Sequence, residues 1–126
     1  MAETYITNPD TQITPHFNSN EFKCKCCGVI MINIRLPQML ERLRSELGQG
    51  IHINSGYRCK KHNKAVGGAA LSQHTQGTAA DIRCDGMSPN IVASAAEKLG
   101  FGGVGRYPSW THVDIRAGKP ARWKEI

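Results

Sequence analysis

His74 and Asp81 are the residues of this 126-residue chain whose types and spacing best suit chemistry; they lie seven positions apart across Gly77. An imidazole nitrogen and a carboxylate oxygen together suit a borderline cation such as zinc, which binds both at about 2.0–2.2 Å. His112 is the natural third ligand, because it lies on the polar face of a predicted late strand. Three protein ligands with an open fourth position are typical of catalytic zinc. The pattern therefore predicts a hydrolytic metal site.

Two motifs make the chain recognisable: Ser72-x-His74-x-x-Gly77-x-Ala79-x-Asp81 and Trp110-x-His112-x-Asp114. They resemble the zinc D-alanyl-D-alanine carboxypeptidase family, which includes cell-wall endopeptidases of bacteriophages and shares its fold with the hedgehog signalling domain. Upstream, Ser55-Gly-Tyr-Arg58, His62-Asn63 and Val66-Gly-Gly68 look like the substrate-side segment of that family. The resemblance runs from about Phe17 to Arg116. It implies that His74, Asp81 and His112 bind one zinc ion per chain.

The same resemblance implies roles for residues beside the zinc ligands. Arg58 would hold a substrate carboxylate or a developing oxyanion, since its guanidinium is a rigid fork of donors that lysine lacks. Ser72 would hydrogen-bond the substrate or support His74, which follows two positions later. Tyr57 is a further candidate for substrate binding, although such aromatic residues more often belong to a core or a pocket rim.

The general base is where the chain departs from the family pattern. Many members carry an acidic residue three positions before the third zinc ligand, but Ser109 occupies that position here. Asp114 lies two residues after His112 and hence on the same strand face, so it is a candidate catalytic residue. Two roles stay open for it: the base itself, or a carboxylate that orients His112 or Arg58.

The resemblance implies a zinc peptidase that hydrolyses peptidoglycan stem peptides, either as a D-Ala-D-Ala carboxypeptidase or as an endopeptidase of the endolysin type. The free carboxylates of such peptides suit Arg58. The alternative is a non-catalytic zinc-binding domain of the same fold that binds cell-wall or protein ligands, which Ser109 favours. No signal peptide is evident, so we expect synthesis in the cytoplasm and action at the bacterial cell wall or periplasm, as suits a phage or prophage lysis enzyme.

Composition sets limits on partners. The formal charge is +6, but Lys and Arg are scattered and aromatic residues make up only 6%, so we do not expect nucleic-acid binding. No apolar stretch approaches the ~18–20 residues of a membrane span. The length fits one domain, residues 1–126, and we expect a monomer.

Five cysteines are an odd number, so at least one thiol is unpaired, bound to metal or linked to another chain. Three of them cluster at Cys24, Cys26 and Cys27, whereas Cys59 and Cys84 stand alone. The simplest interpretation is partly buried thiols near a turn. A structural zinc needs four well-spaced ligands, which the local sequence does not provide, yet a second metal near this cluster stays open.

Hydrophobic patterning predicts an α+β domain with a small antiparallel sheet and flanking helices. The family resemblance implies that this domain has a hedgehog or DD-peptidase-like zinc fold. Residues 1–20 look like an irregular arm, and residues 60–77 like a long ordered loop. Helices are predicted over residues 37–47 and from Ser88-Pro89 to Gly100. Strands are predicted over 51–56, 78–83, 102–107 and 111–116.

Overall fold

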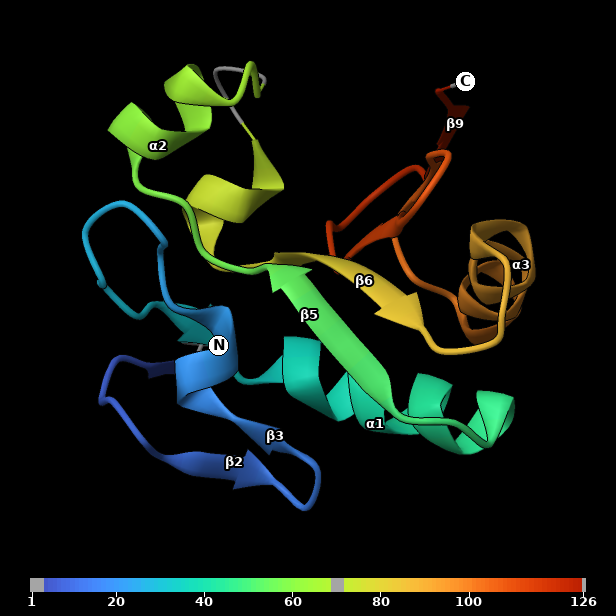
Figure 1. The fold of residues 1–126 in the computed structure, drawn as a ribbon, viewed down its shortest axis with the longest axis horizontal. Coiled ribbons are helices and arrows are strands. Elements are labelled where there is room, and N and C mark those ends of the chain that lie inside the picture. Colours follow the sequence, from blue (N-terminus) through green and yellow to red (C-terminus); the bar gives the residue numbers. More distant parts are fainter. Residues whose placement is uncertain (1–3, 69–71, 126) are drawn as a thin grey trace.

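The computed structural model describes residues 4–68 and 72–125, which form helices and strands around one sheet (Figure 1). The elements in chain order are β1 (Tyr5–Ile6), β2 (Gln12–Thr14), β3 (Phe17–Asn18), η1 (Ser19–Phe22), β4 (Ile32–Asn33), α1 (Arg35–Leu47), β5 (Ile51–Ser55), α2 (Lys60–Ala65), η2 (Gln73–Gln76), β6 (Ala79–Cys84), α3 (Pro89–Leu99), β7 (Gly103–Arg106), β8 (Thr111–Asp114) and β9 (Ala121–Lys124). This arrangement confirms the predicted α+β class.

The central sheet has five strands in the order β5-β6-β8-β7-β9. The first four are antiparallel to their neighbours, as predicted, but β9 pairs parallel to β7, so the sheet is mixed rather than antiparallel. β9 was not predicted, because its four alternating apolar and charged residues are too few to form a recognisable strand pattern. This last strand matters for function, since it closes one side of the candidate site.

One face of the sheet contributes to the hydrophobic core, and the other carries polar side chains. Alternate residues of a strand point to opposite faces, so Ala80 and Ile82 of β6 join the core while Asp81 between them faces the other way. α1 and α3 cover the core face and contact each other. Their contributions to the core are Leu36, Leu40 and Leu43 from α1 and Val92, Ala93 and Ala96 from α3. The opposite face is thereby left for the polar side chains.

Local signals explain where the helices begin and end. Ser88 caps α3 by accepting a hydrogen bond from the backbone N–H of Ile91, and Gly100 ends the helix in a left-handed conformation. α1 ends in the same way at Gly48, although it begins two residues before the predicted Pro37. Both helices therefore agree with the sequence prediction within the usual uncertainty of helix ends.

The segment predicted as one long loop, residues 60–77, is partly helical. It contains α2 and the 3₁₀ turn η2, and residues 69–71 lie outside the described part of the chain. The prediction missed α2 because Lys60-Lys-His-Asn-Lys-Ala65 has no apolar periodicity. Figure 1 shows α2 beyond the end of β5, away from α1.

The N-terminal segment is more regular than the arm predicted over residues 1–20, whose first three residues lie outside the described part. It forms β1, β2 and β3, each only two or three residues long. Phe17 is buried in the core, and Ile13 packs against that core, which anchors this segment to the domain.

No helix within the described residues is long and apolar enough to cross a membrane.

Candidate metal centre

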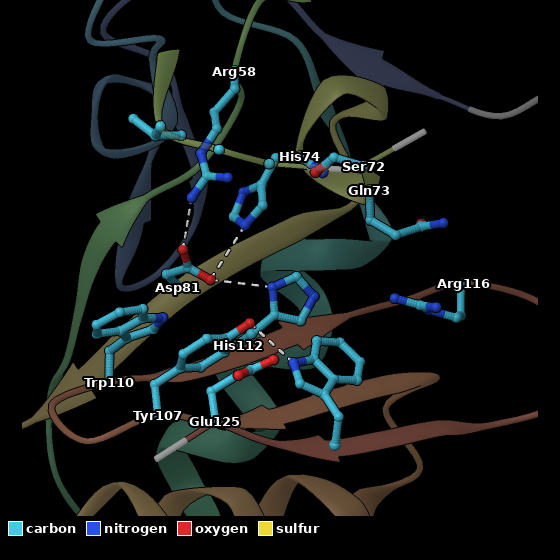
Figure 2. A pocket seen from close by; sticks show the side chains of 14 residues that line it. Arg58, Ser72, Gln73, His74, Asp81, Tyr107, Trp110, His112, Arg116 and Glu125 are labelled. Atoms are coloured by element: carbon cyan, nitrogen blue, oxygen red, sulfur yellow. Dashed lines mark hydrogen bonds and ion pairs between the residues drawn. The ribbon is translucent and has the colours of Figure 1, made fainter. Parts of the chain in front are cut away.

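His74, Asp81 and His112 converge on the face of the sheet opposite the core. One potential ligand atom from each lies within 4.8 Å of the other two (Figure 2). Asp81 on β6 is directly opposite His112 on β8, and His74 comes from η2. η2 ends at Gly77, whose left-handed backbone (φ +72°) and close approach to the Met31 carbonyl both exclude a side chain. The local sequence thus positions all three predicted ligands together.

The hydrogen bonds on the far side of each imidazole determine which nitrogen faces the centre. His74 Nδ1 lies 2.8 Å from the Gly56 carbonyl oxygen, and His112 Nε2 lies 2.7 Å from a carboxylate oxygen of Asp114. Both partners accept hydrogen bonds only, so these nitrogens carry the protons. The lone pairs of His74 Nε2 and His112 Nδ1 then face Asp81 Oδ1, at 3.2 and 3.1 Å.

Three electron-pair donors pointing at one another need a cation between them. Two neutral imidazoles and one carboxylate are a donor set that fits zinc well, and the opposite ring nitrogens already have the fixed partners that metal-binding histidines have. Without such a cation a proton takes its place. Burial lowers the pKa of His112, but hydrogen bonds with Asp114 and Asp81 outweigh it and raise that pKa overall.

Asp81 is held ionised by its surroundings. Burial raises the pKa of its carboxyl, but hydrogen bonds with His112 and His74 outweigh burial and keep the pKa well below its usual range. Its second oxygen, Oδ2, accepts a hydrogen bond from Arg58 Nη2 at 2.9 Å. Arg58 is fixed in turn, because its Nε donates to Ser55 Oγ at 3.1 Å. Arg58 therefore lines the pocket and also orients a predicted ligand.

Asp114 lies behind His112 rather than in the pocket. Its side chain is fully buried, and Arg116 hydrogen-bonds both of its oxygens. Arg116 Nε donates to Oδ1 at 2.8 Å, and Arg116 Nη2 donates to Oδ2 at 2.6 Å. Burial raises the pKa of Asp114, but the hydrogen bonds from Arg116 and His112 lower it far more. A carboxylate so fully bonded is well suited to orienting His112 and poorly suited to accepting a proton from a substrate or a water molecule.

Substituting Asp114 by asparagine tests these two roles. We expect Asp114→Asn to weaken metal binding by about 10–100-fold, the usual effect of losing a partner behind a metal ligand. At saturating metal, kcat should stay within a few-fold of the unsubstituted protein. Competition with a chromophoric chelator gives the affinity, and turnover at fixed metal excess gives kcat. Unchanged affinity with a large loss of kcat would instead identify Asp114 as the base.

Glycines on β7 make room for the polar side chains of β8. Gly103 is opposite Asp114 and Gly105 is opposite His112 in the strand register. A Cβ at position 103 would overlap the Asp114 carboxylate, and one at position 105 would overlap the indole of Trp123 on β9. Because Gly105 has no side chain, the Trp123 ring packs beside the His112 imidazole, with ring centroids 5.0 Å apart.

The metal centre opens into a pocket of about 450 Å³. Besides the three predicted ligands, Arg58 and Ser72 line it, and both were named from the sequence as candidates for substrate binding. Other lining residues include Gln73, Tyr107, Trp110, Arg116, Trp123 and Glu125. The sequence analysis missed Trp123, which lies on β9, and Glu125, which directly follows it; their spacing of two positions was the only available signal. Tyr107 stacks on Trp110 with centroids 4.5 Å apart, forming one wall.

Two residues singled out from the sequence lie elsewhere. Tyr57 is not among the described residues that line the pocket; burial and nearby cysteine thiols raise the pKa of its hydroxyl. Its backbone N–H donates to the Phe22 carbonyl at 2.8 Å, so it helps to join β5 to the N-terminal segment. Ser109, in the turn between β7 and β8, is also not among the described lining residues.

Known proteins are similar in sequence to this chain over most of its length. Residues 15–115 match the family Peptidase M15. The peptidoglycan L,D-endopeptidase MepK of Escherichia coli (strain K12) is 34% identical over 95 residues, which are 70% of this chain and 52% of that protein. The probable peptidoglycan L,D-endopeptidase MepK of Haemophilus influenzae is 35% identical over 81 residues, 60% of this chain and 44% of that protein. The chain spans about half the length of these curated relatives.

The matched region contains β6, β8 and the three convergent ligands, so the comparison and the geometry concern the same part of the molecule. Both confirm the resemblance that the two motifs suggested. The chain belongs to the peptidase M15 family.

Proposed function

We propose that this chain is a zinc-dependent peptidase that cleaves the stem peptides of peptidoglycan, as an endopeptidase. The observation that carries the proposal is the convergence of His74, Asp81 and His112 at an open pocket, with the outer ring nitrogen of each histidine already bonded to an acceptor. The relatives named above are peptidoglycan L,D-endopeptidases, which favours endopeptidase over carboxypeptidase action. The bacterial cell wall would then be the place of action.

His74, Asp81 and His112 would hold the zinc ion, which when bound would supply Lewis acidity toward the scissile carbonyl and toward water. The chain's own residues orient the substrate. Arg58 and Ser72 line one part of the pocket and offer donors to a peptide carbonyl or carboxylate, while the stacked Tyr107 and Trp110 offer an apolar wall. Arg116 lies over the Trp123 ring, 5.5 Å from its centroid, and adds a second cation to the lining.

We propose that Glu125 is the general base, because Ser109, at the position of the usual acidic residue, cannot accept a proton at neutral pH. Among the described residues that line the pocket, Asp81 and Glu125 are the carboxylates, and Asp81 is committed to the metal ligands and Arg58. Glu125 follows β9, and its backbone N–H donates to the Arg106 carbonyl at 2.7 Å, which fixes the end of that strand. Figure 2 shows its carboxylate turned toward the pocket beside Tyr107.

Glu125→Gln removes the proton acceptor while keeping shape and polarity. We expect kcat to fall by about 10²–10⁴-fold, the usual contribution of a general base, while the metal content stays unchanged. Lys124→Gln is the matched control on the same strand, because Lys124 is exposed and does not line this pocket. Full activity in Glu125→Gln would show that proton transfer runs through another group.

The function itself is tested by digesting purified peptidoglycan with the whole chain and identifying the products by mass spectrometry. We expect defined stem-peptide fragments, whose release stops with a zinc chelator and returns when zinc is added back. Cleavage within the stem or cross-link supports the endopeptidase. Release of terminal D-alanine alone would make the protein a carboxypeptidase, and no release from a zinc-loaded chain would leave only a binding domain.

A further inference from the structure

A second group of metal-ligand side chains lies outside the active site. The Sγ atoms of Cys24, Cys27 and Cys59 lie within 4.8 Å of one another. Cys24 and Cys59 are 35 positions apart, so the fold, and not the local sequence, completes the group. All are free thiols in the structure: Cys24 is buried, Cys59 is partly buried and Cys27 is exposed.

The backbone around Cys24 and Cys27 forms a tight turn. The Gly28 N–H donates to the Cys24 carbonyl and the Cys24 N–H donates to the Val29 carbonyl, both at 2.8 Å. Gly28 adopts a left-handed conformation with φ +74°, which a residue with a side chain rarely takes. The turn therefore brings two cysteines that are three positions apart to the same side.

Backbone donors point at the sulfur atoms. The Cys59 N–H donates to Cys24 Sγ at 3.4 Å, and the His62 N–H donates to Cys59 Sγ at 3.4 Å. Such bonds favour the thiolate, which is the form that binds metals.

We propose that Cys24, Cys27 and Cys59 bind a structural zinc ion, with Cys26 as the fourth ligand. Four thiolates around zinc, each at about 2.3 Å, form the most common closed structural site. Cys26 is the remaining cysteine of the same turn and precedes Cys27 directly, although its Sγ does not belong to the group of three sulfur atoms within 4.8 Å of one another. A disulfide would use only two of these sulfur atoms and leave the others without a partner.

The surrounding charges suit a tetrathiolate site, which carries a net charge of −2 with zinc bound. Lys23 and Lys25 flank the first cysteine, and Lys60 and Lys61 follow Cys59. Burial and the neighbouring Cys59 thiol raise the pKa of Cys26 overall, and the Lys61 charge opposes that rise. Four cations near four cysteines offset the negative charge of the complex.

The site would fasten the turn at residues 24–28 to the segment that carries Arg58. That segment already contacts the N-terminal part of the chain, because a Cβ on Gly56 would overlap Phe22. Arg58, next to Cys59, donates its backbone N–H to the His74 carbonyl at 3.1 Å. A metal at the cysteines would therefore stabilise the backbone that positions Arg58, without being part of the catalytic centre.

The test counts metal ions in the whole chain, purified under anaerobic conditions in the presence of zinc. We expect two zinc equivalents per chain by elemental mass spectrometry, falling to one in Cys27→Ser and to one in His112→Ala. Cys84→Ala is the matched control, since Cys84 belongs to the core and not to the thiol group, and it should retain two.

Cobalt(II) substitution identifies which site loses its metal. We expect a thiolate-to-cobalt charge-transfer band in the unsubstituted chain that persists in His112→Ala and disappears in Cys27→Ser. The unsubstituted chain alone gives this readout, even if a cysteine variant fails to fold. One zinc equivalent without the band, or a disulfide among these cysteines in the freshly purified protein, would overturn the proposal. None of these readouts depends on peptidoglycan cleavage, so failure of the proposed function would be seen separately.

Discussion

His112→Ala is expected to remove metal from the catalytic centre and abolish hydrolysis. His112 Nδ1 is one of the three candidate ligand atoms that converge there, and two ligands would bind zinc far more weakly than three. Lewis-acid stabilisation of the transition state is worth several kcal/mol, so kcat/KM should fall by at least about 10³-fold. The measurement pairs metal content at the catalytic centre with turnover on the stem peptides.

The matched control is His52→Ala. His52 is an exposed histidine on β5 that pairs with Asp85 at 3.0 Å and is not among the described residues that line the pocket, so both metal and turnover should be retained. Loss of activity in His112→Ala with full retention of metal would require a different third ligand. Retention of both would exclude the proposed centre altogether.

Arg58→Ala is expected to lower kcat by about 10²–10³-fold, the range found when one donor to a developing negative charge is removed. The metal should stay bound, because all three ligands remain. Arg58→Lys should restore little activity, since a lysine cannot bond Ser55 and Asp81 at once as the guanidinium does. Arg83→Ala, on the exposed Asp85 pair, is the control.

Metal content decides how Arg58 acts. Its side chain is 14% exposed and that of Asp81 is 11% exposed, so their ion pair is largely buried, and removing one partner leaves the other poorly solvated. Loss of metal together with activity would show that Arg58 acts mainly by orienting Asp81. Lost turnover with retained metal would support direct contact with the substrate.

The convergence of the three candidate ligands could be predicted because each lies in a local pattern. His74 and Asp81 belong to one motif of ten residues, and His112 lies on the polar face of a strand that alternates clearly. The same alternation placed Asp114 beside His112, which the 2.7 Å hydrogen bond confirms. The pattern could not reveal that Arg116 and burial would hold Asp114 away from the pocket.

Features that depend on distant pairing were not visible in the sequence. β9 joins the sheet parallel to β7 after a turn, and this pairing alone brings Trp123 and Glu125 to the pocket. Cys59 likewise reaches Cys24 and Cys27 only because β5 returns beside the N-terminal segment. α2 was missed for a different reason: a six-residue helix rich in lysine has no hydrophobic pattern to detect.

The alternation along β6 also determines which changes in chain length this family member can tolerate. Ala80 and Ile82 face the helices while Asp81 between them faces the metal centre. Deleting or inserting one residue within this strand would exchange the two sets, placing a carboxylate in the core and a methyl group at the centre. Length variation among homologues should therefore concentrate in the turns at residues 85–88 and 115–120 and be absent from β6 and β8.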